Sequence, residues 1–188
     1  MATAILYPAS DQGGSGPPGG LKNEAGNSSP LYPSIDEGTA SPNDSDFVES
    51  LGGGTGSGNF IYHFGLSTPP SNVSVVTAVS IAVRLMNSGS KGDVQDWIAL
   101  RLYQSDKTTA LIASQTITDS NSIATYTFNP AITGATTKAA WTGATLALTL
   151  NVGTLAGARL YAAQVTITYT PGASAGLLSR RRRFMMEG

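Results

Sequence analysis

Apolar residues recur at every second position over much of the chain between residues 73 and 169. The longest run places on one face Val75, Thr77, Val79, Ile81, Val83 and Leu85. A repeat of two residues indicates a β-strand with one buried face. The same pattern predicts further strands at residues 59–66, 98–102, 126–128, 146–152 and 161–169.

Turn-forming residues separate these predicted strands, with no helical segment between them. Clusters rich in Gly, Ser, Asn and Asp occur at residues 87–93, 118–121 and 156–157. Residues 137–143 are expected to form a loop or one turn of helix. Several short alternating strands joined by turns are typical of a β-sandwich or barrel, so the predicted fold class is all-β.

The sequence is expected to have three parts. Residues 59–171 carry the alternating pattern and form the predicted β-sandwich. Residues 1–58 are rich in glycine, proline and acidic residues, which predicts an extended arm and linker outside the sandwich. Residues 172–188 are predicted to be a linker followed by a short basic and apolar tail.

The predicted arm holds spaced apolar side chains that it cannot bury by itself. Leu31, Tyr32 and Ile35 are separated by turn-forming residues, and Phe47 follows a second turn. A segment of this kind must lie against its own sandwich or against a neighbouring protein. These residues and the adjacent Asp36 are therefore candidate interface residues.

Charged residues make up only 12% of the 188 residues, and they are segregated along the chain. Residues 1–50 hold seven acids and one base, whereas the C-terminal end carries a run of arginines followed by an aromatic residue, Arg180, Arg181, Arg182, Arg183 and Phe184. Opposite charges at two ends are typical of interaction tails. The arginine run is either a docking peptide or a solvated tail. It lacks interleaved aromatic residues, so nucleic acid is not an expected partner.

One face of the strand at residues 98–102 carries bulky side chains. Trp97, Arg101 and Tyr103 alternate there with apolar residues. Exposed aromatic rings are able to stack on sugars. Since large exposed aromatic side chains need some cover, we expect these three residues to lie at a subunit interface, with a sugar-binding platform as the alternative.

Residues with catalytic or metal-binding potential are few. His63 is the only histidine and lies in a predicted strand, where a lone histidine is usually structural. The absence of cysteine excludes thiolate metal sites and Cys-His pairs. Asn43, Asp44 and Asp46 offer oxygen ligands for Ca²⁺, but their spacing is not that of an EF-hand. We expect no enzymatic activity, cofactor or metal, and no apolar run is long enough for a membrane helix.

Several segments resemble structural proteins of tailed bacteriophages. Residues 31–48 resemble a segment that precedes a β-sandwich in those proteins. The resemblance rests on an aromatic residue, an Ile-Asp-Glu sequence and a Pro-Asn-Asp-Ser-Asp-Phe-Val cluster. Four further segments of this chain are similar to strands of those proteins, namely residues 79–85, 99–103, 111–118 and 159–169. The resemblance implies a jelly-roll-like module on a virion surface or tail, with no catalytic residues.

The adhesive ends and sparse charge favour a protein that binds other copies of itself or a larger scaffold. We expect a non-enzymatic phage virion protein, made in the host cytoplasm, that decorates and cements the capsid. Its arm and tail would bind the major capsid protein or another virion protein and stabilise only the assembled shell. A cyclic homo-oligomer such as a trimer would cover the exposed aromatic residues. On this hypothesis, deleting residues 1–50 leaves the sandwich folded and abolishes docking.

Two alternative functions stay open at this point. One is a carbohydrate-binding module of a tail fibre or baseplate that acts in host adsorption. That role requires Trp97 or Trp141 to be exposed. The other is a tail or neck adaptor that uses the same arm at a different place on the particle.

Overall fold

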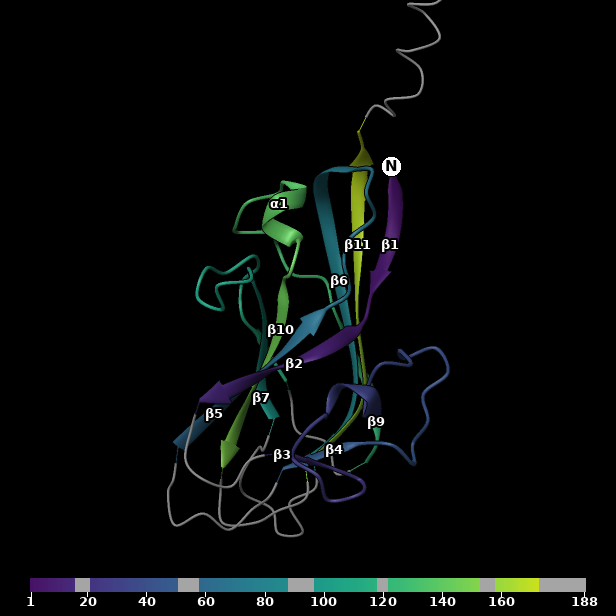
Figure 1. Ribbon diagram of the computed structural model, residues 1–188, viewed down its shortest axis with the longest axis vertical. Coiled ribbons are helices and arrows are strands. Elements are labelled where there is room, and N and C mark those ends of the chain that lie inside the picture. The colour runs from purple at the N-terminus through teal and green to yellow at the C-terminus, as the bar shows by residue number, and fades with distance from the viewer. Residues whose placement is uncertain (16–20, 51–57, 88–96, 118–121, 153–157, 173–188) are drawn as a thin grey trace, which may run out of the picture.

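The computed structural model describes residues 1–15, 21–50, 58–87, 97–117, 122–152 and 158–172. Within them, two antiparallel sheets pack as a β-sandwich (Figure 1), which confirms the predicted all-β class. No helix among these residues is long and apolar enough to cross a membrane. The elements are β1 (Ala2–Leu6), β2 (Pro8–Ser15), β3 (Leu21–Asn23), the 3₁₀ helix η1 (Tyr32–Ser34), β4 (Val48–Ser50), β5 (Gly58–Leu66), β6 (Val73–Asn87), β7 (Trp97–Tyr103), β8 (Gln115–Thr116), β9 (Ala124–Phe128), α1 (Lys138–Trp141), β10 (Thr145–Val152) and β11 (Ala158–Pro171).

Strands that are distant in sequence lie side by side in both sheets. The six-stranded sheet has the order β3-β4-β11-β6-β9, and β1 also pairs with β11. The five-stranded sheet has the order β2-β5-β10-β7-β8. From β5 onward, every connection except β7 to β8 passes from one sheet to the other. This alternation produces the jelly-roll-like topology that the phage resemblance implied.

The two longest strands, β6 and β11, form the centre of the six-stranded sheet. Their antiparallel register runs from the pair Ala158–Asn87 to the pair Pro171–Val73. Inward-facing residues of both sheets form one core, which includes Phe64, Ile81, Val83, Leu100, Leu102, Leu146, Leu148, Val165 and Ile167. Burying one such side chain stabilises the fold by about 1.5–3 kcal/mol.

The alternation along β6 is interrupted at two places. The register with β11 shifts by one residue between Ala78 and Val76 and again between Val75 and Val73, so Thr77 and Ser74 form β-bulges. Val73, Val76 and Val79 are buried, whereas Val75 is 39% exposed. The prediction that Val75 and Thr77 share the buried face with Val79 is therefore wrong, because the bulge at Thr77 reverses the facing of Val75.

The first strands of the chain belong to the sandwich. β1 pairs with β11 in the six-stranded sheet, and β2 pairs with β5 in the five-stranded sheet. The predicted arm of residues 1–58 therefore does not lie outside the sandwich at these strands. β2 has the sequence PASDQGGS, and its pairing with β5 contains two register shifts. A strand this irregular shows no repeat of two residues, which is why the pattern missed it.

Asp11 on β2 fixes the segment that contains the predicted interface residues. Its carboxylate accepts hydrogen bonds from the backbone N–H groups of Leu31 at 2.7 Å and Tyr32 at 2.9 Å. The carbonyl of Ile35 accepts a hydrogen bond from the N–H of Ala163 on β11 at 3.1 Å. Leu31 and Ile35 are fully buried in the core. They lie against their own sandwich and are not outward-facing interface residues.

Candidate functional site

The outer face of the five-stranded sheet brings together side chains from the adjacent strands β5, β10 and β7. Thr145 on β10 lies opposite Tyr103, and Ala147 lies opposite both His63 and Arg101. Neighbouring residues on each strand point into the core, so these side chains point outward. Small residues on the central strand are thus flanked by larger ones on both sides.

Tyr103 is held by two neighbours on this face. The centroid of its ring lies 5.6 Å from that of His63, and the Cζ atom of Arg101 lies 5.5 Å from the Tyr103 centroid. The second distance is typical of a cation–π contact. Thr145, which pairs with Tyr103 across the strands and lies 3.2 Å from Nδ1 of His63, is only 1% exposed. The contacts with His63 and Arg101 hold the Tyr103 ring in place, and the residue is half-buried.

Arg101 has a second contact that orients its guanidinium group. The Nε–H of Arg101 donates a hydrogen bond to the carbonyl of Ile112 at 3.1 Å. A guanidinium group carries five N–H donors in one plane, an arrangement suited to two-pronged contacts with paired oxygen atoms. Arg101 is half-buried, so this group is both positioned by the protein and accessible to a ligand.

His63 is a neutral member of the same face. Its Nδ1 lies 3.2 Å from the hydroxyl of Thr145. Burial lowers the pKa of His63 below its ordinary value of 6.5, and the nearby positive charge of Lys107 lowers it further. Lys107 itself donates a hydrogen bond to the carbonyl of Gln12 at 2.6 Å. At pH 7 the imidazole is uncharged and is able to accept as well as donate a hydrogen bond.

The turn that follows β7 is held beside this face by Asp106. Its carboxylate accepts hydrogen bonds from the backbone N–H groups of Thr108 at 3.0 Å and Thr109 at 2.8 Å, and from the hydroxyl of Thr109. These bonds, the Thr109 hydroxyl first, lower the pKa of Asp106 to about 2. Lys107 adopts a left-handed conformation, with φ of 61°. The charged form of Asp106 therefore maintains an unusual backbone turn.

We expect this turn to loosen in strong acid. Because the pKa of Asp106 is lowered from 3.8 to about 2, its carboxylate stabilises the turn above pH 3.8, and this contribution is lost as the pH falls through 2. NMR chemical shifts of the Thr108 and Thr109 amides should titrate with a midpoint near that lower value. An Asp106→Asn variant should show no such titration, and equal titration in both proteins would contradict the assignment.

Three other predicted residues are described but do not join this face. Tyr32 packs half-buried against the core. The ring of Phe47 lies under the guanidinium group of Arg159, with 4.2 Å from Cζ to the ring centroid. Burial raises the pKa of Glu37, and the negative charge of Asp36 raises it further. These contacts are made within the chain and bring no further group to Tyr103.

The remaining predicted residues divide into two groups. The arginines Arg180–Arg183 and Phe184 lie outside the described residues, as does the side chain of Trp97 on β7. Trp141 is fully buried, and its Nε1–H donates a hydrogen bond to the carbonyl of Ala135 at 3.1 Å. Trp141 therefore does not provide the exposed ring that the carbohydrate-binding alternative required. Tyr103 is a half-buried aromatic residue on the outer face of the five-stranded sheet.

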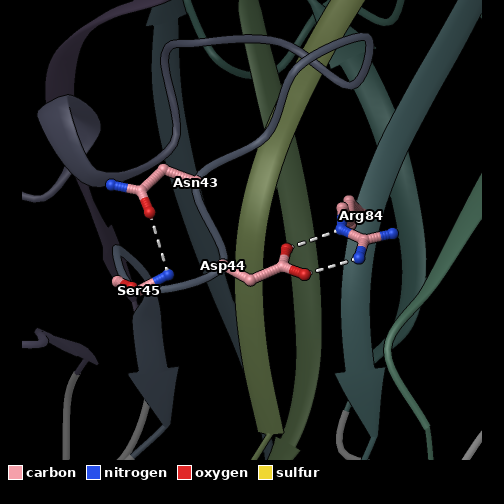
Figure 2. A network of polar contacts seen from close by, with 4 residues as sticks. All are labelled: Asn43, Asp44, Ser45 and Arg84. Atoms are coloured by element: carbon pink, nitrogen blue, oxygen red, sulfur yellow. Dashed lines mark hydrogen bonds and ion pairs between the residues drawn. The ribbon is translucent and has the colours of Figure 1, made fainter.

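The oxygen cluster considered for Ca²⁺ is engaged by the protein's own donors (Figure 2). Both oxygens of Asp44 accept hydrogen bonds from Arg84 on β6, at 2.7 Å from Nε and 2.6 Å from Nη2. Asn43 accepts from the N–H of Ser45 at 3.1 Å and donates to Asp46 at 2.7 Å. No group of three or more His, Cys, Asp or Glu residues suited to a metal occurs in the described part of the chain. The contacts fasten this loop to β6.

His63 and Thr145 are the members of the candidate site that the sequence did not identify. The strand pattern places His63 on the face of the strand that points away from Tyr62 and Phe64. A lone histidine, however, gave no reason to assign it a ligand. The approach of His63 to Thr145 and Tyr103 depends on the register of three strands. That register joins residues up to 82 positions apart, as in the His63–Thr145 contact.

Comparison with known proteins finds similarity in fold alone. No family model and no curated protein matches the chain. Among solved structures, the enzymatically active domain of tailspike protein 4 from bacteriophage CBA120 has 11% sequence identity and a TM-score of 0.45. The match covers 88% of this chain and 19% of the tailspike chain, so this chain spans less than two thirds of its length.

Two further structures match at similar distance. A cleaved adhesin domain of Lys-gingipain from Porphyromonas gingivalis has 14% identity and a TM-score of 0.42, with 90% of this chain and 99% of that chain covered. A CBM4 structure has 13% identity and a TM-score of 0.35, with 69% and 72% covered. The chain is thus a β-sandwich with distant structural matches to tailspike, adhesin and CBM4 domains, and no specific family is indicated.

Proposed function

We propose that this chain is a non-enzymatic carbohydrate-binding module that uses the outer face of its five-stranded sheet. The observation that carries the proposal is the Tyr103 ring, held between His63 and Arg101 above the small residues of β10. In the virion of a tailed phage, such a module would act in adsorption to host glycans at a tail fibre or baseplate. The virion location rests on the sequence resemblance described above.

The chemistry of this face suits a sugar. A pyranose ring presents an apolar C–H face, which stacks on an aromatic ring, and hydroxyl groups, which need hydrogen-bond partners at its edge. Tyr103 provides a half-buried ring on the surface of the sheet. Arg101 provides planar donors and the neutral His63 provides a donor and an acceptor. Since both neighbours already contact Tyr103, little conformational entropy is lost when a ligand binds.

The same face is poorly equipped for hydrolysis. A glycosidase ordinarily needs two carboxyl groups on either side of the scissile bond, and one of them must be able to give up a proton near neutral pH. Asp106 lies beside the face but is bound to the Thr108–Thr109 turn, with its pKa lowered to about 2. The proposal therefore assigns binding without cleavage.

The capsid-decoration role predicted from sequence has less support than adsorption. That role used Leu31 and Ile35 as anchors for a neighbouring capsid subunit. Both side chains are fully buried in this chain's own core, so they are not available to a partner. The carbohydrate-binding role needs only residues that the sandwich already presents on its surface.

The test is a printed array of bacterial surface oligosaccharides, followed by calorimetry with the strongest binder. Tyr103→Ala should weaken binding about twofold to twelvefold, because one stacking contact is worth about 0.5–1.5 kcal/mol. Tyr103→Phe keeps the ring and should retain most of the affinity. Val75→Ala, on the exposed face of the other sheet, is the matched control and should bind like the parent. Absence of array binding, or full affinity in Tyr103→Ala, would contradict the proposal.

A further inference from the structure

β1 is an open edge of the six-stranded sheet (Figure 1). It pairs with β11 on one side, from Ala2–Tyr169 to Leu6–Val165, and no described strand pairs with its other side. Proteins usually protect such edges with charged residues, prolines or bulges. The strand ATAIL contains no charge and no proline, and its register with β11 is unbroken. The backbone N–H and C=O groups on that open side have no partner strand among the described residues and are able to pair with a strand of another chain.

The side chains of β1 divide cleanly between the two faces of the sheet. Ala2 and Ala4 are half-buried and pack against the core. Thr3 is exposed, Ile5 is 45% exposed and Met1, which precedes the strand, is 98% exposed. Large apolar side chains with so much exposure are suited to cover by a partner.

We propose that β1 pairs antiparallel with β1 of a second copy about a two-fold axis, joining the two six-stranded sheets into one continuous sheet. A two-fold axis makes identical strands antiparallel and places the same patch on both sides. With the axis at Thr3, Met1 lies opposite the partner's Ile5, and Ala2 lies opposite the partner's Ala4. This register pairs exposed side chains with exposed ones and core-facing ones with core-facing ones.

Charge also favours a second copy as the occupant of this edge. β1 carries no charged side chain, so two copies meet with no like-charge pair across the axis. The chain as a whole has a net charge of only −1, which gives little repulsion between copies. The glycan face proposed above belongs to the other sheet and stays accessible, so the dimer would present two such faces and gain avidity.

The first test measures the monomer–dimer dissociation constant of the full chain by sedimentation equilibrium. Ile5→Lys should raise that constant about twofold to thirtyfold, because each cross-strand pair contributes about 0.2–1 kcal/mol and the two-fold axis removes two such pairs. Val75→Lys makes a similar change on an exposed residue of the same sheet, away from β1, and should leave the constant unchanged. A monomeric parent protein, or a dimer that Ile5→Lys does not weaken, would overturn the proposal.

A second test locates the contact directly. The chain has no cysteine, so a single introduced thiol gives an unambiguous cross-link. Thr3→Cys should be joined to a second copy by a short bismaleimide reagent within minutes of its addition to the dimer. Thr127→Cys, on the opposite edge strand β9, is also exposed and is the matched control. Cross-linking at Thr127→Cys that equals or exceeds that at Thr3→Cys would overturn the assignment of the interface to β1.

Discussion

Removal of residues 1–50 is expected to unfold the sandwich. This segment supplies β1, β2 and several side chains that are at most 3% exposed in the core, Leu6, Leu21, Leu31, Ile35 and Val48. Each contributes about 1.5–3 kcal/mol on burial, so their combined loss is comparable with the whole net stability of a domain, about 5–15 kcal/mol. The truncated chain should lose its cooperative thermal transition in circular dichroism. The sequence alone had predicted the opposite, a folded sandwich without its arm.

Single substitutions in the same segment separate a core role from a general effect of truncation. Ile35→Ala should lower the free energy of unfolding by about 2–5 kcal/mol, since it leaves a cavity under the β11 contact. Val75→Ala changes a residue that is 39% exposed and should cost much less. If the truncated chain still melted cooperatively at the parent temperature, residues 1–50 would not be part of the core.

Replacement of Trp141 with alanine is expected to cost about 3–5 kcal/mol in the free energy of unfolding. Trp141 ends α1, is fully buried, and belongs to the core that both sheets share. Its removal would also leave the Ala135 carbonyl without the indole donor that now lies 3.1 Å away. Urea denaturation of the parent, Trp141→Ala and Trp141→Phe proteins measures the effect.

The phenylalanine variant of Trp141 distinguishes the two contributions. Trp141→Phe fills most of the volume but lacks the N–H group, so its stability should lie between those of the parent and the alanine variant. A cost below about 1 kcal/mol for Trp141→Ala would mean that the ring is exposed. In that event Trp141, and not Tyr103 alone, would have to be considered for sugar stacking.

The parts of the fold that the sequence predicted are the long strands that bury one face. The alternation is visible in strands with enough residues, namely β5, β6, β7, β10 and β11. Residues 137–143, predicted to be a loop or one turn of helix, contain the short helix α1. β3 and β4 have three residues each, which is too short for any repeat. β2 contains two glycines and pairs irregularly, so only its tertiary contact with β5 shows that it is a strand.

The candidate site was predicted in part for the same physical reason. The alternation along β7 correctly placed Arg101 and Tyr103 on the face opposite Leu100 and Leu102. It could not show that His63, on β5, lies 5.6 Å from Tyr103, because that distance depends on how two strands pair with β10. Local patterns determine which way a side chain points, whereas strand register determines which other side chain it meets.

The proposed function and the proposed dimer use different surfaces of one sandwich. Glycan binding involves the outer face of the five-stranded sheet, and copy pairing involves the β1 edge of the six-stranded sheet. Ile5→Lys should therefore leave the affinity for a monovalent oligosaccharide unchanged, while Tyr103→Ala should leave the dimer intact. Weak individual sites combined in one assembly are able to bind a repetitive surface tightly.

The measurement that tests the account most directly is an NMR titration of the parent protein with the oligosaccharide that binds most strongly on the array. If the outer face of the five-stranded sheet binds the glycan, the largest amide shift changes will occur at His63, Arg101, Tyr103 and Thr145. Residues of β6 and β11 will change little. Shift changes concentrated on the six-stranded sheet or around η1, or no change at saturating ligand, would contradict the proposed site.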